Sequence, residues 1–299
     1  MSLSVGVIGL GAVGGLYASM LSRHSDISVH AVSRFHSDQI LKEGISIMSP
    51  WGNSVYYPDS VVSCISDLPK PMDYLLICTK VFPNEQFHLS ISSVLTDNTK
   101  IVLLQNGLSI ENPYIQTYSN RLISGISFVC SVRHSPTVIE HFDYGDIILG
   151  LYPSGLHDDV LQLCDRFNRV GVTAHASELI CSDRWKKLLW NASFNPISVL
   201  SQLDTQSILS HPKWFLKIKQ VMVEVQQLAA LSGFPIDNSF IDHLISRTKK
   251  MKPYKPSMLV DFENGRPMEI DAILGAAIKV ADNHALEVPE LRYLYHSLN

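Results

Sequence analysis

Short apolar runs alternate with amphipathic segments through the first half of the chain. Five such runs, rich in β-branched and aliphatic residues, cover residues 5–10, 28–33, 74–79, 100–105 and 121–129. They show little alternation of apolar and polar positions, which is typical of strands covered on both faces in a parallel sheet. Residues 12–24 have helical periodicity and separate the first two runs, so the pattern predicts repeated strand–helix–strand units and a doubly wound α/β fold. Residues 132–152 are expected to add antiparallel strands to that sheet.

Helical periodicity dominates beyond residue 176. The predicted helices cover residues 178–194, 214–233, 238–251 and 268–285, and no strand is predicted among them. The segments 251–256 and 262–267 contain proline, glycine or asparagine and are expected to separate helices. We therefore expect a parallel-sheet domain over residues 1–176 and an all-helical domain over residues 177–299.

The composition agrees with two folded domains and narrows the classes of partner. A chain of 299 residues is long enough for two domains that each bury a core. Hydrophobic residues make up 46% of it and charged residues 17%, which leaves little room for disorder. The formal net charge of −4 and a pI of about 6.3 give no electrostatic reason to expect nucleic acid or an anionic membrane as a partner.

The cysteines and the N-terminal segment predict a cytoplasmic protein without a metal site. The five cysteines form no CxxC pair and no cluster with histidine, so we expect reduced core residues and no bound metal. The chain begins MSLSVGVIGLG, without a basic region or a signal-peptidase site, and we interpret this as the absence of an export signal. No run approaches the roughly 18 apolar residues of a membrane span.

A glycine-rich loop follows the first predicted strand and opens the first predicted helix. It consists of Gly9, Leu10, Gly11, Ala12, Val13 and Gly14. In a GxGxxG loop the first glycine allows a tight turn, the second lets a pyrophosphate approach the backbone, and the third lets helix and strand pack closely. Because the loop lies between a strand and a helix, it predicts a Rossmann-type dinucleotide site in preference to a purely structural turn.

The end of the second predicted strand indicates which dinucleotide binds. NAD sites usually carry an acidic residue there, whereas this chain has Ser33 and Arg34. A guanidinium beside a hydroxyl suits a 2′-phosphate, so NADP(H) is preferred over NAD(H). The alternative is that Arg34 is a solvated loop charge.

Two further residues follow predicted strands at the same edge of the sheet. Lys80 follows the third run, and Asn106 lies in the QNG sequence after the fourth. Ligands of open α/β sheets collect at the carboxyl ends of the strands, so we expect both residues to contact cofactor or substrate. The alternative is that they are ordinary loop residues.

A polar stripe interrupts the apolar helix in the sequence DRWKKLLWNASFNP. Lys187, Asn191 and Asn195 are four residues apart and lie on one face of a helix. A lysine there could protonate a carbonyl oxygen that is being reduced by hydride, while the asparagines orient it or the substrate. Lys186 points about 100° away and is expected at the surface. The alternative is that Lys187 caps a carbonyl or reaches water and that the asparagines satisfy buried backbone groups.

The chain resembles the ketopantoate reductase (2-dehydropantoate 2-reductase) family. The resemblance is carried by GLGAVGG with Lys80 and QNG, by WKKLLWNASFNP, and by SMLVDFENGRPMEID, and it spans essentially the whole chain in order. It implies a Rossmann domain followed by a helical domain. It also implies an oxidoreductase that uses NADPH to reduce a branched 2-keto acid, ketopantoate, to pantoate for pantothenate and coenzyme A synthesis.

The resemblance also implies roles for individual residues. For the cofactor, Gly9, Gly11 and Gly14 match the family's phosphate loop, and Arg34 and Lys80 match its basic contacts. Asn106 matches the asparagine near nicotinamide and substrate, Lys187 matches the general acid, and Glu269 matches the acid near that lysine. For the substrate, Asn191 and Asn195 match the substrate-side amides, and Ser257 matches the residue that binds the substrate carboxylate. From the residues alone, Ser257 is better explained as an N-cap and Glu269 as a first-turn residue of a helix.

Two competing functions stay open at this stage. One is a related dehydrogenase that acts on another 2-keto acid, a 3-hydroxyacid or an opine, because fold alone does not determine substrate. The other is a non-catalytic NADPH-binding regulator, which would not need the polar stripe. A homodimer is allowed, since the sequence does not fix the oligomeric state.

Overall fold

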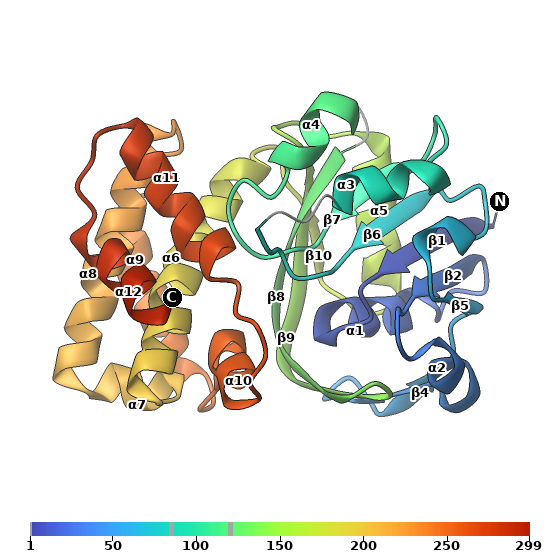
Figure 1. Ribbon diagram of the computed structural model, residues 1–299, viewed down its shortest axis with the longest axis horizontal. Helices are drawn as coiled ribbons and strands as arrows, with labels where there is room; N and C mark the ends of the chain where they lie inside the picture. The colour runs from blue at the N-terminus through green and yellow to red at the C-terminus, as the bar shows by residue number, and fades with distance from the viewer. Residues whose placement is uncertain (1, 84–86, 119–121) are drawn as a thin grey trace. The chain divides into compact units, whose positions relative to one another are not determined.

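The chain folds into two compact units, which are described separately. The computed structural model describes residues 2–83, 87–118 and 122–299, so Arg121 of the predicted strand 121–129 lies outside the described residues (Figure 1). The first unit comprises Met1–Lys80, Asn84–Gln105 and Glu111–Ile180, and the second comprises Val81–Pro83, Asn106–Ile110 and Cys181–Asn299. The predicted domain boundary at residue 176 stays a prediction, because the second unit also takes two short segments from earlier in the chain.

A ten-stranded sheet forms the centre of the first unit. Its strands are β1 (Leu3–Ile8), β2 (Ile27–Val32), β3 (Ile45–Met48), β4 (Ser54–Tyr56), β5 (Ser60–Val62), β6 (Tyr74–Ile77), β7 (Lys100–Leu103), β8 (Leu122–Ser135), β9 (Val138–Leu151) and β10 (Ala174–Ala176). The strands β5-β2-β1-β6-β7-β8 are neighbours in this order and are all parallel. This is the doubly wound Rossmann order, with its switch point between β1 and β6.

Antiparallel strands extend the sheet beyond β8. The long strands β8 and β9 pair antiparallel, which confirms the addition predicted over residues 132–152 (Figure 1). β3 then pairs parallel with β9 and antiparallel with β4. The sequence pattern did not predict β3, β4, β5 or β10, because each has only three or four residues and lies outside the extended apolar runs that revealed the equally short β6 and β7.

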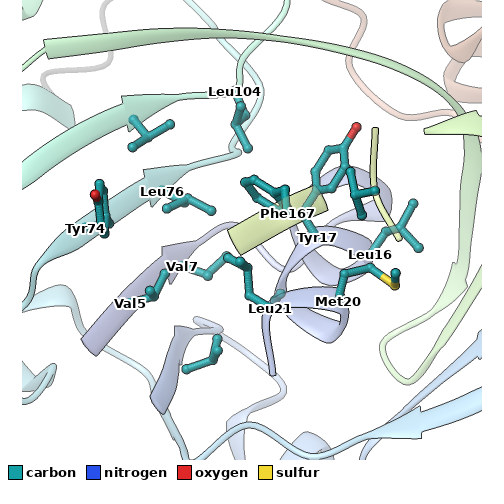
Figure 2. Packing of buried hydrophobic residues seen from close by; sticks show 14 of the residues in the cluster. Val5, Val7, Leu16, Tyr17, Met20, Leu21, Tyr74, Leu76, Leu104 and Phe167 are labelled. Atoms are coloured by element: carbon teal, nitrogen blue, oxygen red, sulfur yellow. The ribbon is translucent and has the colours of Figure 1, made fainter. Parts of the chain in front are cut away.

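The first unit also contains helices that pack on this sheet. They are α1 (Ala12–Leu21), α2 (Ser37–Glu43), α3 (Phe87–Ser90), α4 (Asn112–Tyr118) and α5 (Asp158–Arg169), with short 3-10 turns at Ile65–Asp67 and Ile91–Val94. Figure 2 shows the core where α1 and α5 meet the strands. Tyr17 of α1 and Phe167 of α5 are fully buried there, and their rings meet edge to face at 5.6 Å. This packing fixes α1 directly behind the glycine loop.

The described part of the second unit contains helices and no strand, in agreement with the predicted all-helical character. Its elements are α6 (Ile180–Ser201), α7 (Thr205–Ser210), α8 (Pro212–Leu231), α9 (Ser239–Lys250), α10 (Ser257–Glu263), the π-helical turn η4 (Asp271–Gly275), α11 (Ala276–Asn283) and α12 (Pro289–Leu298). The helices α7 and α12 were not predicted. None of the helices in the described ranges combines the length and the hydropathy that a bilayer crossing requires.

The prediction that the first helix of this unit ends at residue 194 was wrong. The helix α6 continues to Ser201 and passes through Pro196. Proline removes one main-chain hydrogen bond from a helix interior. Phe194, Ile197 and Val199 are buried in the core of this unit, so their packing outweighs the lost bond.

A second correction concerns the predicted helix over 268–285. In the structure this stretch is not one regular helix: the π-helical turn η4 comes first and α11 follows it. The segment Asn106–Ile110 packs against η4. The Leu108 N–H donates to the Ala272 carbonyl at 2.9 Å. Gly107 has a φ of +107°, and a Cβ on it would lie 2.6 Å from the Ala272 oxygen. Only glycine fits this position, because any side chain would collide with backbone.

Replacing Gly107 by alanine should therefore destabilise the second unit by about 2–4 kcal/mol, the sum of left-handed strain and a backbone clash. Gly233→Ala is the matched control, since Gly233 lies in the same unit with a φ of +86° and nothing within 4 Å of a Cβ. We expect it to cost about 1 kcal/mol. Denaturant unfolding followed by tryptophan fluorescence measures both, and equal losses would show that the Ala272 contact carries no constraint.

Candidate active site

The glycine loop has the geometry of a phosphate cradle. Gly9 has a φ of +97°, and a Cβ on it would lie 2.8 Å from the Thr79 nitrogen. A Cβ on Gly14 would lie 2.2 Å from the Gly9 oxygen, whereas a Cβ on Gly11 would meet nothing within 4 Å. The chain is thus tightly packed on both sides of Gly11 and open at Gly11 itself. The helix α1 begins directly afterwards without an acidic residue in its first turn, so its N-terminal N–H groups suit an anionic phosphate.

Further polar residues of the first unit lie at the same carboxyl edge of the sheet. Ser33 follows β2, and its N–H donates to the Val62 carbonyl at 2.9 Å. Arg34 is exposed and forms no ion pair with the described residues. Its guanidinium is therefore available to an anion. The hydroxyls of Ser37 and Ser63 lie 3.1 Å apart on the same side, after β2 and β5.

The QNG sequence is anchored by its glutamine. The Gln105 amide donates to the Thr79 carbonyl at 2.9 Å and to the Thr79 hydroxyl at 3.0 Å. Thr79 in turn packs against Gly9, and half-buried Lys80 follows it directly. This contact holds the ends of β6 and β7 beside the glycine loop, so Lys80 emerges at the edge where ligands of such sheets bind.

In the second unit, the predicted general acid is hydrogen-bonded to a predicted substrate residue. Lys187 of α6 donates from Nζ to Oδ1 of Asn106 at 2.8 Å. Lys186, the adjacent lysine, is half-exposed and pairs with Asp183 at 3.0 Å. The two neighbouring lysines therefore have different environments, and only Lys187 lies with the candidate site residues.

Glu269 lies in the same cluster, just before η4. Its Oε1 accepts a hydrogen bond from the Val81 N–H at 3.0 Å, and its main-chain oxygen accepts from the Ile273 N–H at 3.2 Å. The carboxylate is thereby held where its negative charge favours the protonated form of Lys187. Lys187, Asn106 and Glu269 thus come together from three separate segments of the second unit.

The environment of Lys187 brings its pKa close to neutral. Burial, together with the positive charge of Arg184 and against the opposing charge of Glu269, lowers the pKa of Lys187 to about 7. A group is most effective as a general acid when its pKa lies near the working pH. The cluster can therefore deliver a proton to an oxygen that develops negative charge.

The two asparagines on α6 are buried, with exposed fractions of 7% for Asn191 and 3% for Asn195. The side-chain oxygen of Asn195 has no hydrogen-bond partner among the described residues. A buried amide oxygen left unpaired costs about 1–3 kcal/mol, so this one favours a ligand or water as its partner over the alternative role of satisfying backbone.

Ser257 is placed differently from the other predicted residues. It is the first residue of α10, directly after Pro256, and its side chain is exposed. Within the described ranges, no hydrogen bond connects it to the Lys187 cluster. A role for Ser257 in carboxylate binding stays a prediction.

Sequence reasoning missed Arg184, three residues before Lys187 on α6. Its side chain is buried, with 6% exposed, and NH1 donates to the Gly107 carbonyl at 3.1 Å. An arginine within an apolar helix, at a spacing that places it beside Lys187, was the available signal.

Models of one protein family match most of the chain. The model of the family "Ketopantoate reductase PanE/ApbA" matches residues 5–154, and that of its C-terminal domain matches residues 180–299. A 2-dehydropantoate 2-reductase of Nostoc sp. is 28% identical over 98% of this chain and 93% of its own length.

Solved structures show the same likeness. The crystal structure of 2-dehydropantoate 2-reductase from Methylococcus capsulatus is 35% identical, with a TM-score of 0.90, over 99% of this chain and 96% of that one. A D-mandelate dehydrogenase solved with NADH and anilino(oxo)acetate shares the fold, with a TM-score of 0.90 at 21% identity over 98% of this chain and 96% of its own. The family models and the relative at 35% identity together show that this chain belongs to the ketopantoate reductase family.

Proposed function

We propose that the protein is an NADPH-dependent 2-dehydropantoate 2-reductase, which reduces ketopantoate to pantoate in the cytoplasm as a step towards pantothenate and coenzyme A. The observation that carries this proposal is the hydrogen bond between half-buried Lys187 and Asn106, on a lysine whose pKa desolvation lowers to about 7 against the opposing charge of Glu269. The names of the relatives and the fit of the glycine loop to a dinucleotide support the reaction class.

In the proposed reaction the substrate carbonyl gains one hydride and one proton. A nicotinamide dinucleotide held at the glycine loop would supply the hydride to the keto carbon. Nζ of Lys187 donates the proton to the oxygen, which becomes the hydroxyl of the product, and Lys187 is left neutral. Asn106 holds Nζ in place through its 2.8 Å hydrogen bond, and Glu269 favours the return of a proton to Lys187.

The remaining predicted substrate residues supply polar groups around the keto acid. The unpaired amide oxygen of Asn195 suits a hydroxyl donor of the substrate, and Asn191 lies one helical turn before it on α6. We assign the substrate carboxylate to Ser257 on the resemblance alone. Substrates without the matching hydroxyl should leave Asn195 unpaired and bind less well.

The reduction should slow as the pH rises through the pKa of Lys187. The protonated lysine is the acid, so it is fully available below its pKa of about 7 and is lost above it. We expect kcat for reduction to fall about tenfold per unit well above that value, and kcat for oxidation of the hydroxy acid to rise over the same range. Initial rates at saturating substrate from about pH 5.5 to 9.5 measure this dependence.

Lys187→Ala should remove this pH dependence and lower kcat at least about a hundredfold, while the Kd for NADPH changes less than about twofold. Lys186→Ala is the matched control, because Lys186 pairs with Asp183 outside the cluster. It should keep both the rate and the profile. A flat profile in the unaltered protein would contradict the assignment of Lys187 as the acid.

The choice of NADPH rests on Arg34. Replacing it by alanine removes a charge-assisted contact to the 2′-phosphate, so we expect KM for NADPH to rise about tenfold or more and KM for NADH to stay within about twofold. Lys42→Ala, which removes an exposed cation from α2 in the same unit, serves as the control for a general loss of positive charge. An unchanged preference for NADPH in Arg34→Ala would remove Arg34 from the cofactor site.

A further inference from the structure

Arg184 is the buried cation that the proposed reaction does not yet use. Its side chain is 6% exposed, and NH1 donates to the Gly107 carbonyl at 3.1 Å. Burying an arginine costs free energy unless its charge and N–H groups have partners, so a buried arginine usually reflects a constraint. The partner here is the main chain immediately after Asn106.

The turn that contains Gly107 is fixed from two sides. The Gly107 carbonyl accepts from Arg184 on α6, and the next N–H, that of Leu108, donates to the Ala272 carbonyl in η4 at 2.9 Å. Gly107 itself is pressed against Ala272 in a left-handed conformation. The turn therefore has little freedom to move relative to α6 or η4.

This arrangement closes a ring of contacts around the proposed acid. Arg184 of α6 donates to the Gly107 carbonyl, and Gly107 directly follows Asn106 in the chain. The Asn106 side chain accepts a hydrogen bond of 2.8 Å from Lys187, which lies on the same helix as Arg184. Because Arg184 and Lys187 are three residues apart, they lie on the same face of α6. Arg184 and Lys187 therefore hold the Asn106–Gly107 segment to the same face of α6 at two points.

We propose that Arg184 is a positioning residue for the reduction: it ties the Asn106–Gly107 turn to α6 and so fixes the direction in which Lys187 presents its proton. The expected change in kcat rests on the proposed function, whereas the attachment of the Asn106–Gly107 turn to α6 does not depend on the substrate. Arg184 acts through the Gly107 carbonyl, Asn106 and Lys187.

The charge of Arg184 has a second effect on the same lysine. An arginine stays protonated at every working pH, so its positive charge always opposes a proton on Lys187. The negative charge of Glu269 acts on the same lysine with the opposite effect. Arg184 therefore helps to keep the pKa of Lys187 low and makes its proton easier to release.

Three substitutions separate the two effects. Arg184→Lys keeps the charge, Arg184→Gln keeps an N–H donor without charge, and Arg184→Met keeps only the approximate length. Lys186→Met, one helical position before Lys187 and outside the ring, is the control. Each full-length variant is measured in three ways: by the melting temperature, by the kcat profile with ketopantoate and NADPH, and by NMR titration of the lysine Cε resonance that disappears in Lys187→Ala.

The expected pattern differs from that of a merely structural arginine. Arg184→Gln and Arg184→Met remove the charge, so the pKa of Lys187 should rise in both by about half a unit or more. Arg184→Lys keeps the charge and should leave that pKa unchanged. Without the hydrogen bond, in Arg184→Met, the plateau of kcat should fall about tenfold to a hundredfold, while NADPH affinity stays within about twofold. Arg184→Gln should recover most of that plateau.

Two results would overturn the proposal. One is an unchanged plateau of kcat in Arg184→Met, and the other is a loss of kcat that follows the melting temperature equally in all three variants. Failure of the proposed function has a different signature: the unaltered protein would not turn over ketopantoate, yet the Lys187 resonance would still report whether Arg184 acts on it.

Discussion

The proposed chemistry of this protein depends on the desolvation of one ammonium group, that of Lys187. Lys187 lies in a helix that also carries core residues such as Leu188 and Leu189, and desolvation is the largest of the effects that bring its pKa down to about 7. Such a cost is tolerated only where neighbouring groups hold the lysine in place. Asn106 accepts its hydrogen bond and Glu269 supplies the compensating charge, so the site and its surroundings form one electrostatic unit.

The helical unit is organised around this group. The helix α6 carries Arg184, Lys187, Asn191 and Asn195 through more than two turns and remains helical through Pro196 because its apolar side chains are buried. The segment Asn106–Ile110 and the turn η4 bring Asn106 and Glu269 to the helix, and they fit together only because residue 107 is glycine. The nucleotide-binding features, in contrast, belong to the sheet unit and follow from strand order and the glycine loop.

Features with a local sequence signal could be predicted, and features formed by distant contacts could not. The glycine loop, the parallel core of the sheet and the stripe on α6 have characteristic spacings, so each was visible in the sequence. Residues 106 and 187 are 81 positions apart, and no local pattern shows that their side chains meet. The position of QNG after a predicted strand singled out Asn106, and resemblance to a family singled out Glu269, whereas the hydrogen bond from Arg184 to Gly107 has no local sequence signal.

The measurement that tests the central claim most directly is the oxidation of NADPH by the purified protein with a panel of 2-keto acids headed by ketopantoate. The account predicts rapid turnover of ketopantoate, slower turnover of analogues without its hydroxyl, and a weaker reaction with NADH. Tight binding of NADPH without reduction of any 2-keto acid would contradict it, because the tuned lysine would then have no carbonyl oxygen to protonate.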